Sequence, residues 1–303
     1  MNYVRRLPKF EYLAPKSLKE ACSILAANKG KAKILAGGSD LLSQMKKREE
    51  TPGFLVGLRG IKGLSDIKGD SAKGLKIGPL ATIHDLETSP AIKNGYDILN
   101  QVASVFASTQ IRNVATIAGN VAAASPSADT FPPLVALGAR VKVVSSRGQR
   151  TVPLQDVFTT PYHNSLADDE LVSEIIVPGL PAGSGGAYLK HMIRQAMDRA
   201  FVNVAVVLTR QKDVCSKVKI VVGVCSHCWR RPECKPRCPF PTNMASAEAV
   251  LKGKKLDERL IGEAAQKAAK ESRPRVEVDY KKHLIEVLTR RALTQAWAAA
   301  QGK

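Results

Sequence analysis

Two short turns are the first candidates for chemistry in this 303-residue sequence. The first turn joins an apolar segment, a glycine pair and a helix start in the run Ile34, Leu35, Ala36, Gly37, Gly38, Ser39, Asp40 and Leu41. Glycines let a backbone turn sharply and approach a ligand, and free N–H groups beside a helix N-terminus can bind a phosphate. Because Ser39 and Asp40 are also common helix N-cap residues, an ordinary strand–turn–helix joint is the alternative.

The second turn strengthens the case for a phosphate site. It combines small residues with side-chain hydrogen-bond donors in the run Ile111, Arg112, Asn113, Val114, Ala115, Thr116, Ile117, Ala118, Gly119 and Asn120. A small, polar run follows over residues 122–129 and ends at Asp129, which is either a binding carboxylate or a helix N-cap. Two such turns can grip one diphosphate from two sides.

Four of the six cysteines form a third candidate site. The pattern C-x2-C-x5-C-x3-C-P contains Cys225, Cys228, Cys234 and Cys238. Its closing C-x3-C-P is shared with the bacterial ferredoxin pattern, and four nearby arginines and lysines would offset the charge of a thiolate-ligated cluster. The five-residue gap is short for a structural zinc site, so the spacing favours iron–sulfur over zinc, with simple surface thiols as the remaining alternative.

Alternating and helical apolar patterns predict the elements that must hold these candidates. The first 60 residues form a small α/β lobe, in which a capping box at Ser17 and Glu20 opens a helix with Cys22 in the core. Its other elements are a strand at 33–36, a helix at 41–47 and a strand at 54–58. A second lobe contains strands at 75–78, 140–144 and 171–177, a helix at 98–106 and a hairpin turn at 146–149.

A cluster of prolines and glycines over residues 178–186 is typical of a linker and predicts the main domain boundary. Beyond it we expect strands at 188–190, 202–208 and 217–224, with Val218, Ile220 and Val222 facing inward. Helices follow at 247–251, 256–271 and 279–300, and Cys215 is a structural strand residue. The whole pattern indicates an α+β fold of two domains, covering residues 1–178 and 183–303.

Composition narrows the class of protein. The chain is 44% hydrophobic and 24% charged, as is ordinary for a globular protein, and it has no apolar run of the roughly 20 residues that span a membrane. Its start lacks the apolar segment of a signal peptide, so we expect a cytoplasmic protein with reduced cysteines. The net charge of +19 is scattered and aromatic residues make up only 5%, which argues against nucleic-acid binding and favours an acidic protein partner or solubility alone.

The two turns together resemble those of the FAD-binding subunit of the molybdenum hydroxylases, the family of xanthine dehydrogenase, carbon monoxide dehydrogenase and 4-hydroxybenzoyl-CoA reductase. Members carry an A-G-G-x-[DS]-L turn and an I-R-N-x-A-T-x-G-G-N turn, which match residues 36–41 and 111–120. Ala118 replaces one glycine of the second motif, which requires a negative φ at that position. The resemblance covers residues 10–298 except the cysteine segment at 225–241, which looks like an insertion.

The resemblance implies a fold in detail. The FAD-binding domain would be of the vanillyl-alcohol-oxidase type, with lobes at residues 1–60 and 61–178. The C-terminal domain would be a smaller α+β unit with a three-stranded sheet and helices. The flavin subunit of 4-hydroxybenzoyl-CoA reductase carries an extra [4Fe–4S] cluster, but its insertion lies in the FAD domain rather than at residues 225–241.

The resemblance also implies roles for individual residues. Residues 34–41 would hold the FAD diphosphate and adjoining ribose, and residues 116–120 would close on it from the other side, with Arg112 and Asn113 in the same turn. Phe106 matches a position against the adenine; without the resemblance it would be a core residue.

Nearer the flavin ring, Asp129 matches a carboxylate that hydrogen-bonds FAD, and Val172 matches a backbone contact. Lys190 matches a lysine near the isoalloxazine ring, where a cation would stabilise the anionic reduced flavin and raise its potential. Without the resemblance, Lys190 would be assigned to a solvent-exposed face. Arg194 and Asp198 match polar residues bordering the flavin face.

The implied function is electron transfer within a heteromeric oxidoreductase. A large subunit would carry the molybdenum cofactor, a small subunit two [2Fe–2S] clusters, and this chain FAD and a [4Fe–4S] relay to an external carrier such as a ferredoxin or NAD. One alternative is a non-redox nucleotide-binding module with a structural zinc loop. Another is a stand-alone flavin oxidase, for which Glu170 and His191 are only isolated polar candidates.

Overall fold

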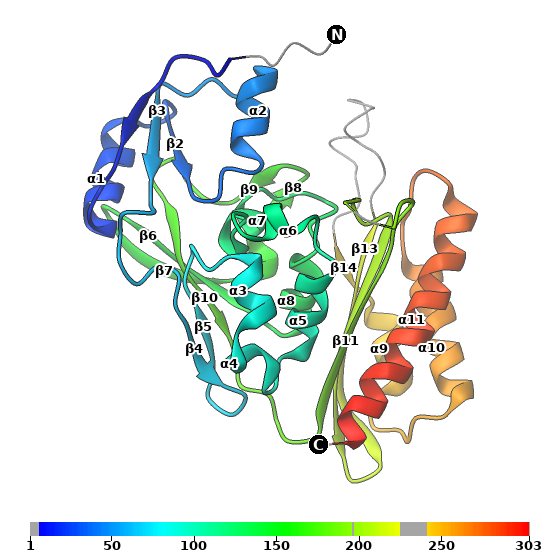
Figure 1. Cartoon of the computed structure of the whole chain (residues 1–303). Helices are drawn as coiled ribbons and strands as arrows, with labels where there is room; N and C mark the ends of the chain where they lie inside the picture. The colour runs from blue at the N-terminus through cyan, green and yellow to red at the C-terminus, as the bar shows by residue number, and fades with distance from the viewer. Residues whose placement is uncertain (1–5, 196, 225–240, 303) are drawn as a thin grey trace.

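The computed structural model describes residues 6–195, 197–224 and 241–302. Successive parts of the chain form a three-stranded, a five-stranded and a four-stranded sheet, with a small two-stranded sheet beside the second (Figure 1). In the second and C-terminal parts, runs of strands and runs of helices are segregated along the chain, so the predicted α+β class is confirmed. No helix in the described part of the chain is long and apolar enough to cross a membrane.

The first lobe is a parallel sheet in the order β1-β3-β2, formed by β1 (Glu11–Leu13), β3 (Phe54–Gly57) and β2 (Ala32–Leu35). Helix α1 (Leu18–Ala27) buries Cys22 in the core, as predicted. Only half of the predicted capping box forms. Ser17 accepts from the Glu20 N–H at 3.1 Å, but the Glu20 carboxylate accepts from the Lys16 N–H instead of the Ser17 N–H. Helix α2 (Leu41–Lys47) follows the first turn.

The second lobe is an antiparallel sheet in the order β4-β5-β10-β6-β7. Its strands are β4 (Ile67–Asp70), β5 (Gly74–Ile77), β6 (Arg140–Ser145), β7 (Gly148–Pro153) and β10 (Leu171–Val177). Between β5 and β6 the chain forms six short helices: α3 (Ile83–Thr88), α4 (Pro90–Lys93), α5 (Asp97–Ser104), α6 (Thr109–Arg112), α7 (Ile117–Ala122) and α8 (Phe131–Ala136). After β7 come η1 (Leu154–Val157), β8 (Phe158–Thr160) and β9 (His163–Asn164).

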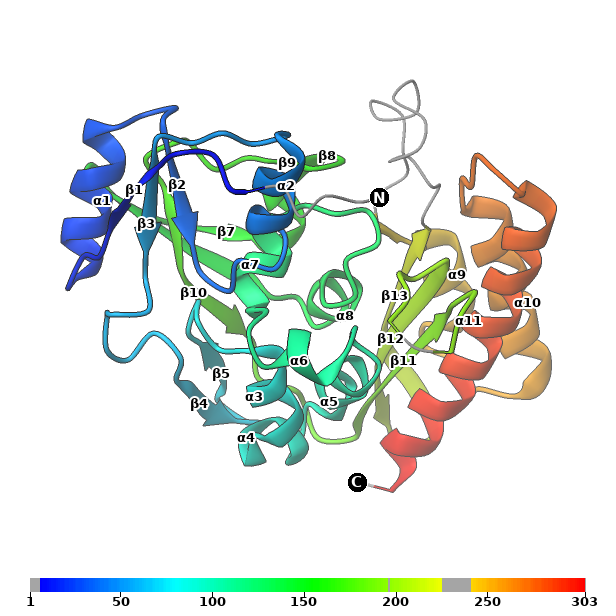
Figure 2. The same ribbon diagram turned by 45° about the horizontal axis from the view of Figure 1, so that its top comes forward.

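The C-terminal sheet is antiparallel in the order β11-β12-β13-β14. Its long strands are β11 (Ser184–His191), β12 (Val202–Gln211) and β13 (Val214–Val224). A fourth strand of two residues, β14 (Thr242–Asn243), adds to the three predicted; it is too short to leave an alternating pattern. Helices α9 (Ala245–Leu251), α10 (Glu258–Glu271) and α11 (Val278–Gln301) cover one face of this sheet (Figures 1 and 2).

The glycines at 185 and 186 are strand residues rather than linker residues, which corrects the expectation for the end of the 178–186 cluster. A Cβ on Gly185 would overlap the carbonyl oxygen of Ala296 in α11, and one on Gly186 would lie 3.1 Å from the Cβ of Ile98 in α5. These glycines therefore allow α11 and α5 to approach opposite faces of β11, and flexibility is not their role.

Strand β12 is buried on both faces because the C-terminal sheet lies between two sets of helices. Its even-numbered residues Val202, Val204 and Val206 pack in one core with α9, α10 and α11. Its odd-numbered residues Ala205 and Val207 belong to the core of the second lobe, into which α5 and α8 also project. Val218, Ile220 and Val222 of β13 lie in the first of these cores, as predicted.

Candidate functional site

The two predicted turns lie against each other. A Cβ on Gly37 would overlap the carbonyl oxygen of Val114, so the first turn approaches the second as closely as a glycine allows. Gly38 has φ +78°, a conformation that glycine adopts without the strain other residues would incur. Asp40 stands at the N-cap of α2 but makes no side-chain capping bond. The N-cap alternative is thus not what the structure shows for Asp40.

The first turn leaves its backbone donors available. Among the described residues, no acceptor is found for the N–H groups of Gly37, Gly38, Ser39 and Asp40. These residues are partly or fully exposed, so the donors can reach a ligand. Several free N–H groups in one turn are the feature that binds a phosphate. The turn therefore fits a diphosphate group.

The second turn is held rigidly. The backbone N–H of Ile117 donates to the carbonyl of Ala81 at 3.0 Å, and that of Ile83 donates to Ala115 at 2.9 Å. The Thr116 hydroxyl caps α7 by accepting from the Gly119 N–H at 3.1 Å. Ala118 lies within α7 and has no positive φ, as the replacement of glycine requires.

The other residues predicted around the second turn differ in burial and in their hydrogen-bond partners. Arg112 donates to Glu87, to the Phe106 carbonyl and to Thr109, and so ties α6 to α3 and to the chain at Phe106. Phe106 is buried in the core, while Asn113 is exposed. The Asn120 side chain accepts from the Thr130 hydroxyl at 2.6 Å. Val172 is a buried residue of β10 that belongs to the same core as Ile117 and Val121.

The strongest polar feature is a buried ion pair between the two domains. The Lys190 Nζ of β11 donates to Asp129 Oδ2 at 2.8 Å, and these side chains are only 1% and 9% exposed. The same Nζ lies 3.4 Å from the Val105 carbonyl oxygen. Because Lys190 is buried, the alternative of a solvated lysine is wrong. The alternative of Asp129 as a helix N-cap is also wrong, because Thr130 is the N-cap of α8.

Two further residues complete this cluster, and sequence reasoning missed both. The Tyr188 hydroxyl donates to Asp129 Oδ1 at 2.8 Å, and Asn203 Nδ2 donates to the Tyr188 hydroxyl at 3.2 Å. Strand geometry explains the grouping. Tyr188 and Lys190 are two apart on β11, and Asn203 is the register partner of Lys190 on β12, so all three side chains share one face. A polar Asn203 within the otherwise apolar run 202–208 was the available signal.

Burial governs the protonation of this cluster. Desolvation raises the pKa of Asp129 above its ordinary value, although the charge of Lys190 and the hydrogen bonds from Lys190, Tyr188 and Asn203 act in the opposite direction. Burial and the nearby carboxylate also raise the pKa of Tyr188 well above 10, so its hydroxyl stays protonated and remains a donor.

The remaining candidates lie elsewhere. Arg194 and Asp198 form an exposed 3.5 Å ion pair in the turn after β11. His191 Nε2 lies 3.4 Å from the Tyr280 hydroxyl, and Glu170 pairs with Arg150 at 2.7 Å. Cys225, Cys228, Cys234 and Cys238 lie outside the described residues. Within the described ranges, no group of three or more potential metal-ligating side chains occurs.

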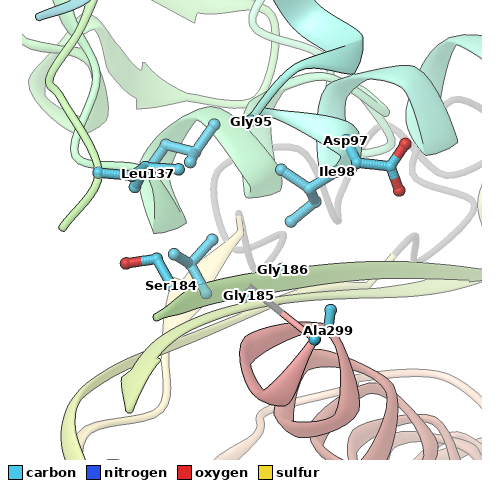
Figure 3. A pocket seen from close by; sticks show the side chains of 11 residues that line it. Gly95, Asp97, Ile98, Leu137, Ser184, Gly185, Gly186 and Ala299 are labelled. Carbon is cyan, nitrogen blue, oxygen red and sulfur yellow. The ribbon is translucent and has the colours of Figure 1, made fainter. Parts of the chain in front are cut away.

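A cavity of about 370 Å³ opens between the domains, but it is not the predicted site. It is lined largely by glycine and aliphatic residues, and Ile98 of α5 points into it toward Gly186 (Figure 3). Asp97 is the one charged side chain among its lining residues. None of the residues of the two turns or of the Asp129 cluster lines it, so the donor-rich turns define the candidate site.

Comparisons with known proteins match both parts of the chain. Residues 8–180 match the family described as "FAD binding domain in molybdopterin dehydrogenase", and residues 187–296 match "CO dehydrogenase flavoprotein C-terminal domain". The carbon monoxide dehydrogenase medium chain of Hydrogenophaga pseudoflava is 32% identical over 295 residues, covering 96% of this chain and 98% of that protein. The nicotine 6-hydroxylase medium subunit of Paenarthrobacter nicotinovorans is 30% identical, covering 97% and 99%.

Solved structures agree. The chain is similar to one of carbon monoxide dehydrogenase from Hydrogenophaga pseudoflava, with a TM-score of 0.88, 31% identity and coverage of 97% of this chain and 99% of that one. It is also similar to a chain of quinoline 2-oxidoreductase from Pseudomonas putida 86, with a TM-score of 0.84, 29% identity and coverage of 98% and 99%.

Proposed function

Because this chain belongs to the family of FAD-binding medium subunits of the molybdenum hydroxylases, we propose that it binds FAD between its two turns and the Asp129–Lys190 cluster. The chain is an FAD-dependent oxidoreductase subunit. The single observation that carries the proposed site is the contact of Gly37 with Val114, which brings a turn whose four N–H groups have no acceptor among the described residues against a second small-residue turn.

Each part of the proposed site has a separate task. The N–H groups of residues 37–40 bind the diphosphate, and residues 116–120 close the opposite side. Phe106 contributes an apolar wall on the adenine side, and Val172 a backbone contact. Arg112 and Asn113 belong to this site by position, although the guanidinium of Arg112 is held by Glu87 and the Phe106 carbonyl. Residues 1–178 form the FAD-binding domain in this proposal, and residues 183–303 the C-terminal domain.

Bound FAD accepts two electrons and can pass them on one at a time. The chain's own contribution is to place Lys190 and Asp129 beside the ring end of the site. An ammonium there favours negative charge on the ring, while its 2.8 Å pairing with Asp129 limits how much of its charge is felt. Burial of both groups excludes water from that end of the site.

The partners follow from the family. We propose a large subunit with the molybdenum cofactor, where the substrate reacts, and a small subunit with two [2Fe–2S] clusters. The medium-chain names and near-complete coverage of the relatives support this assembly. The surplus of 46 basic over 27 acidic residues favours an acidic external electron carrier, such as a ferredoxin, with NAD as the other candidate acceptor.

The four-cysteine pattern adds a further proposed centre. Cys225, Cys228, Cys234 and Cys238 would hold a [4Fe–4S] cluster that passes electrons singly to or from the external carrier. Support comes from the spacing alone, since these residues lie outside the described part of the chain. Zinc at the same cysteines is the alternative, and a redox-inert metal would exclude the relay.

The test is analysis of the complex purified anaerobically with its co-expressed partner subunits. We expect about one FAD per medium chain, released as a yellow compound on denaturation. Iron and acid-labile sulfide should exceed the small subunit's share by about four each. No flavin released from the denatured complex would contradict the flavin assignment. Bound flavin with one zinc and no extra iron would contradict only the relay.

A further inference from the structure

The Asp129 cluster contains two side chains that have no assigned role in the flavin site. Tyr188 lies two residues before Lys190 on β11, and Asn203 is the register partner of Lys190 on the adjacent strand β12. Both are buried, at 5% and 1% exposure. Burying a phenol and an amide costs free energy unless hydrogen bonds compensate, so such a group in a core calls for an explanation.

Both oxygens of the Asp129 carboxylate are held from the C-terminal sheet. Oδ2 accepts from Lys190 Nζ and Oδ1 from the Tyr188 hydroxyl, each at 2.8 Å. Asn203 Nδ2 in turn donates to the Tyr188 oxygen at 3.2 Å, which leaves the phenolic hydrogen free to point at Asp129. The chain Asn203 to Tyr188 to Asp129 thus has one consistent direction of donation.

Further contacts fix the positions of Tyr188 and Asn203. The Tyr188 backbone N–H donates to Gln101 Oε1 of α5 at 2.8 Å, which anchors this point of β11 to the FAD-binding lobe. Gly223 of β13 makes room for Asn203, because a Cβ there would overlap Asn203 Oδ1. Strands β12 and β13 are therefore shaped to hold the amide where it meets Tyr188.

We propose that Tyr188 and Asn203 are positioning residues, which keep Asp129 ionised and oriented so that Asp129 in turn holds Lys190 at the flavin site. This inference rests on the proposed FAD-binding function. Its content is that residues of the C-terminal sheet set the charge state of a carboxylate in the FAD-binding domain. Without the Tyr188 hydroxyl, Asp129 loses a donor to its charged form and takes up a proton at higher pH.

Few groups other than Lys190, Tyr188 and Asn203 influence the pKa of Asp129. Lys190 and Tyr188 on β11 are the titratable side chains whose interactions bear on its pKa, and β12 presents the neutral Asn203. The segment after α5 contributes the Val105 carbonyl, which contacts Lys190 and carries no charge. A change in the protonation of Asp129 on removal of the Tyr188 hydroxyl can therefore be assigned to that hydroxyl.

The test compares Tyr188→Phe with Tyr96→Phe in the full-length chain. Tyr96 is a matched control because it is also fully buried and its hydroxyl donates a 2.8 Å hydrogen bond, to the Pro178 carbonyl and away from Asp129. Two quantities are measured from about pH 4 to pH 8: the FAD dissociation constant, by quenching of flavin fluorescence, and the urea midpoint of the FAD-free chain.

For Tyr188→Phe we expect FAD to bind at least about tenfold more weakly at neutral pH, because an orienting hydrogen bond to a charged group is lost. The acid limb of FAD binding should move up by roughly one pH unit. In the FAD-free chain, the loss in urea midpoint should grow as pH rises, because only ionised Asp129 needs the donor. Tyr96→Phe should lower the urea midpoint equally at every pH and leave the acid limb in place.

Equal behaviour of the two phenylalanine variants would overturn the proposal while leaving FAD binding intact. Failure of the wild-type chain to bind FAD would instead overturn the proposed function, and the FAD-free urea series would still decide the role of Tyr188. Asn203→Ala provides a second variant should Tyr188→Phe fail to fold. Among the described residues Asn203 Oδ1 has no partner, so this truncation removes an unpaired buried acceptor together with the amide donor that serves Tyr188 and lowers the pKa of Asp129. For Asn203→Ala we expect smaller changes of the same sign in FAD affinity, in the acid limb of FAD binding and in the urea midpoint.

Discussion

Asp129 and Lys190 form a buried ion pair at the proposed flavin site. Taking two charges out of water costs several kcal/mol per ion, and the attraction between them offsets this only when geometry is good and other lone pairs are satisfied. Here Tyr188 and the Val105 carbonyl supply those further contacts. The pair is therefore tolerated in the core, but neither charge is tolerated alone.

This gives a prediction for single and double replacement. Asp129→Asn or Lys190→Met alone should lower the free energy of unfolding by about 3–5 kcal/mol, because each leaves an uncompensated buried group. The double variant should recover most of the loss. Urea unfolding of the FAD-free chain at neutral pH measures all three. Two losses that simply add would show that the groups do not interact in solution.

The two described cysteines give a second prediction at this scale. Burial raises the pKa of Cys215 to about 11, and burial together with the charge of Asp169 raises the pKa of Cys22. Relative to an ordinary thiol, the thiolate fraction of Cys215 near pH 8 is lower by about a hundredfold. Iodoacetamide should therefore leave both cysteines unmodified in the native chain and modify both in guanidinium, as read by peptide mass spectrometry. Rapid modification of native Cys215 would show that β13 opens.

At the scale of elements, the contact between the two turns makes the sharpest prediction. Gly37→Ala places a methyl group on the Val114 carbonyl, so the turns must separate. We expect FAD affinity to fall by at least about a hundredfold, in line with the loss of two or more phosphate hydrogen bonds. Flavin fluorescence titration measures this.

Gly262→Ala is the matched control. Gly262 lies within α10, no atom would lie within 4 Å of an added Cβ, and its φ is not positive. Alanine there should stabilise the chain by about 0.5–1 kcal/mol through helix propensity and leave FAD affinity unchanged. Unchanged affinity in Gly37→Ala would mean that the diphosphate is bound elsewhere.

The elements also show what the sequence could and could not reveal. Strand β10 (Leu171–Val177) and helix α2 (Leu41–Lys47) agree with the predicted bounds because local apolar patterns define them. The sequence predicts a linker at Gly185 and Gly186 because a glycine needed for close packing has the same local signature as a flexible one. Only the position of α11 against β11 distinguishes the two.

The site was predictable from the sequence only where its residues form local motifs. The turns at 34–41 and 111–120 are local motifs, so their residues could be named from the chain alone. The roles of Tyr188 and Asn203 depend on the register between β11 and β12 and on a loop 59 residues before Tyr188. No local pattern carries that information, and Lys190 without it looks like a solvated lysine.

At the scale of the whole molecule, the core crosses the domain boundary. The large hydrophobic cluster that contains Leu75, Ile77 and Val177 of the second lobe also contains Ala205 and Val207 of the C-terminal sheet. The Asp129–Lys190 pair crosses the same junction. Burial of this shared surface is lost if either domain unfolds, so each domain stabilises the other.

We therefore predict one cooperative unfolding transition for the whole chain in scanning calorimetry. FAD at about a hundred times its dissociation constant should add about 2.7 kcal/mol, which raises Tm by roughly 4 °C for a chain of this size. The increase should appear in the single transition, because FAD bound to the first domain also holds the second through Lys190. Two transitions, of which only the lower responds to FAD, would show that the junction does not couple the domains. A chain ending at residue 180 should then fold alone, whereas a coupled junction predicts that its exposed apolar face makes it aggregate.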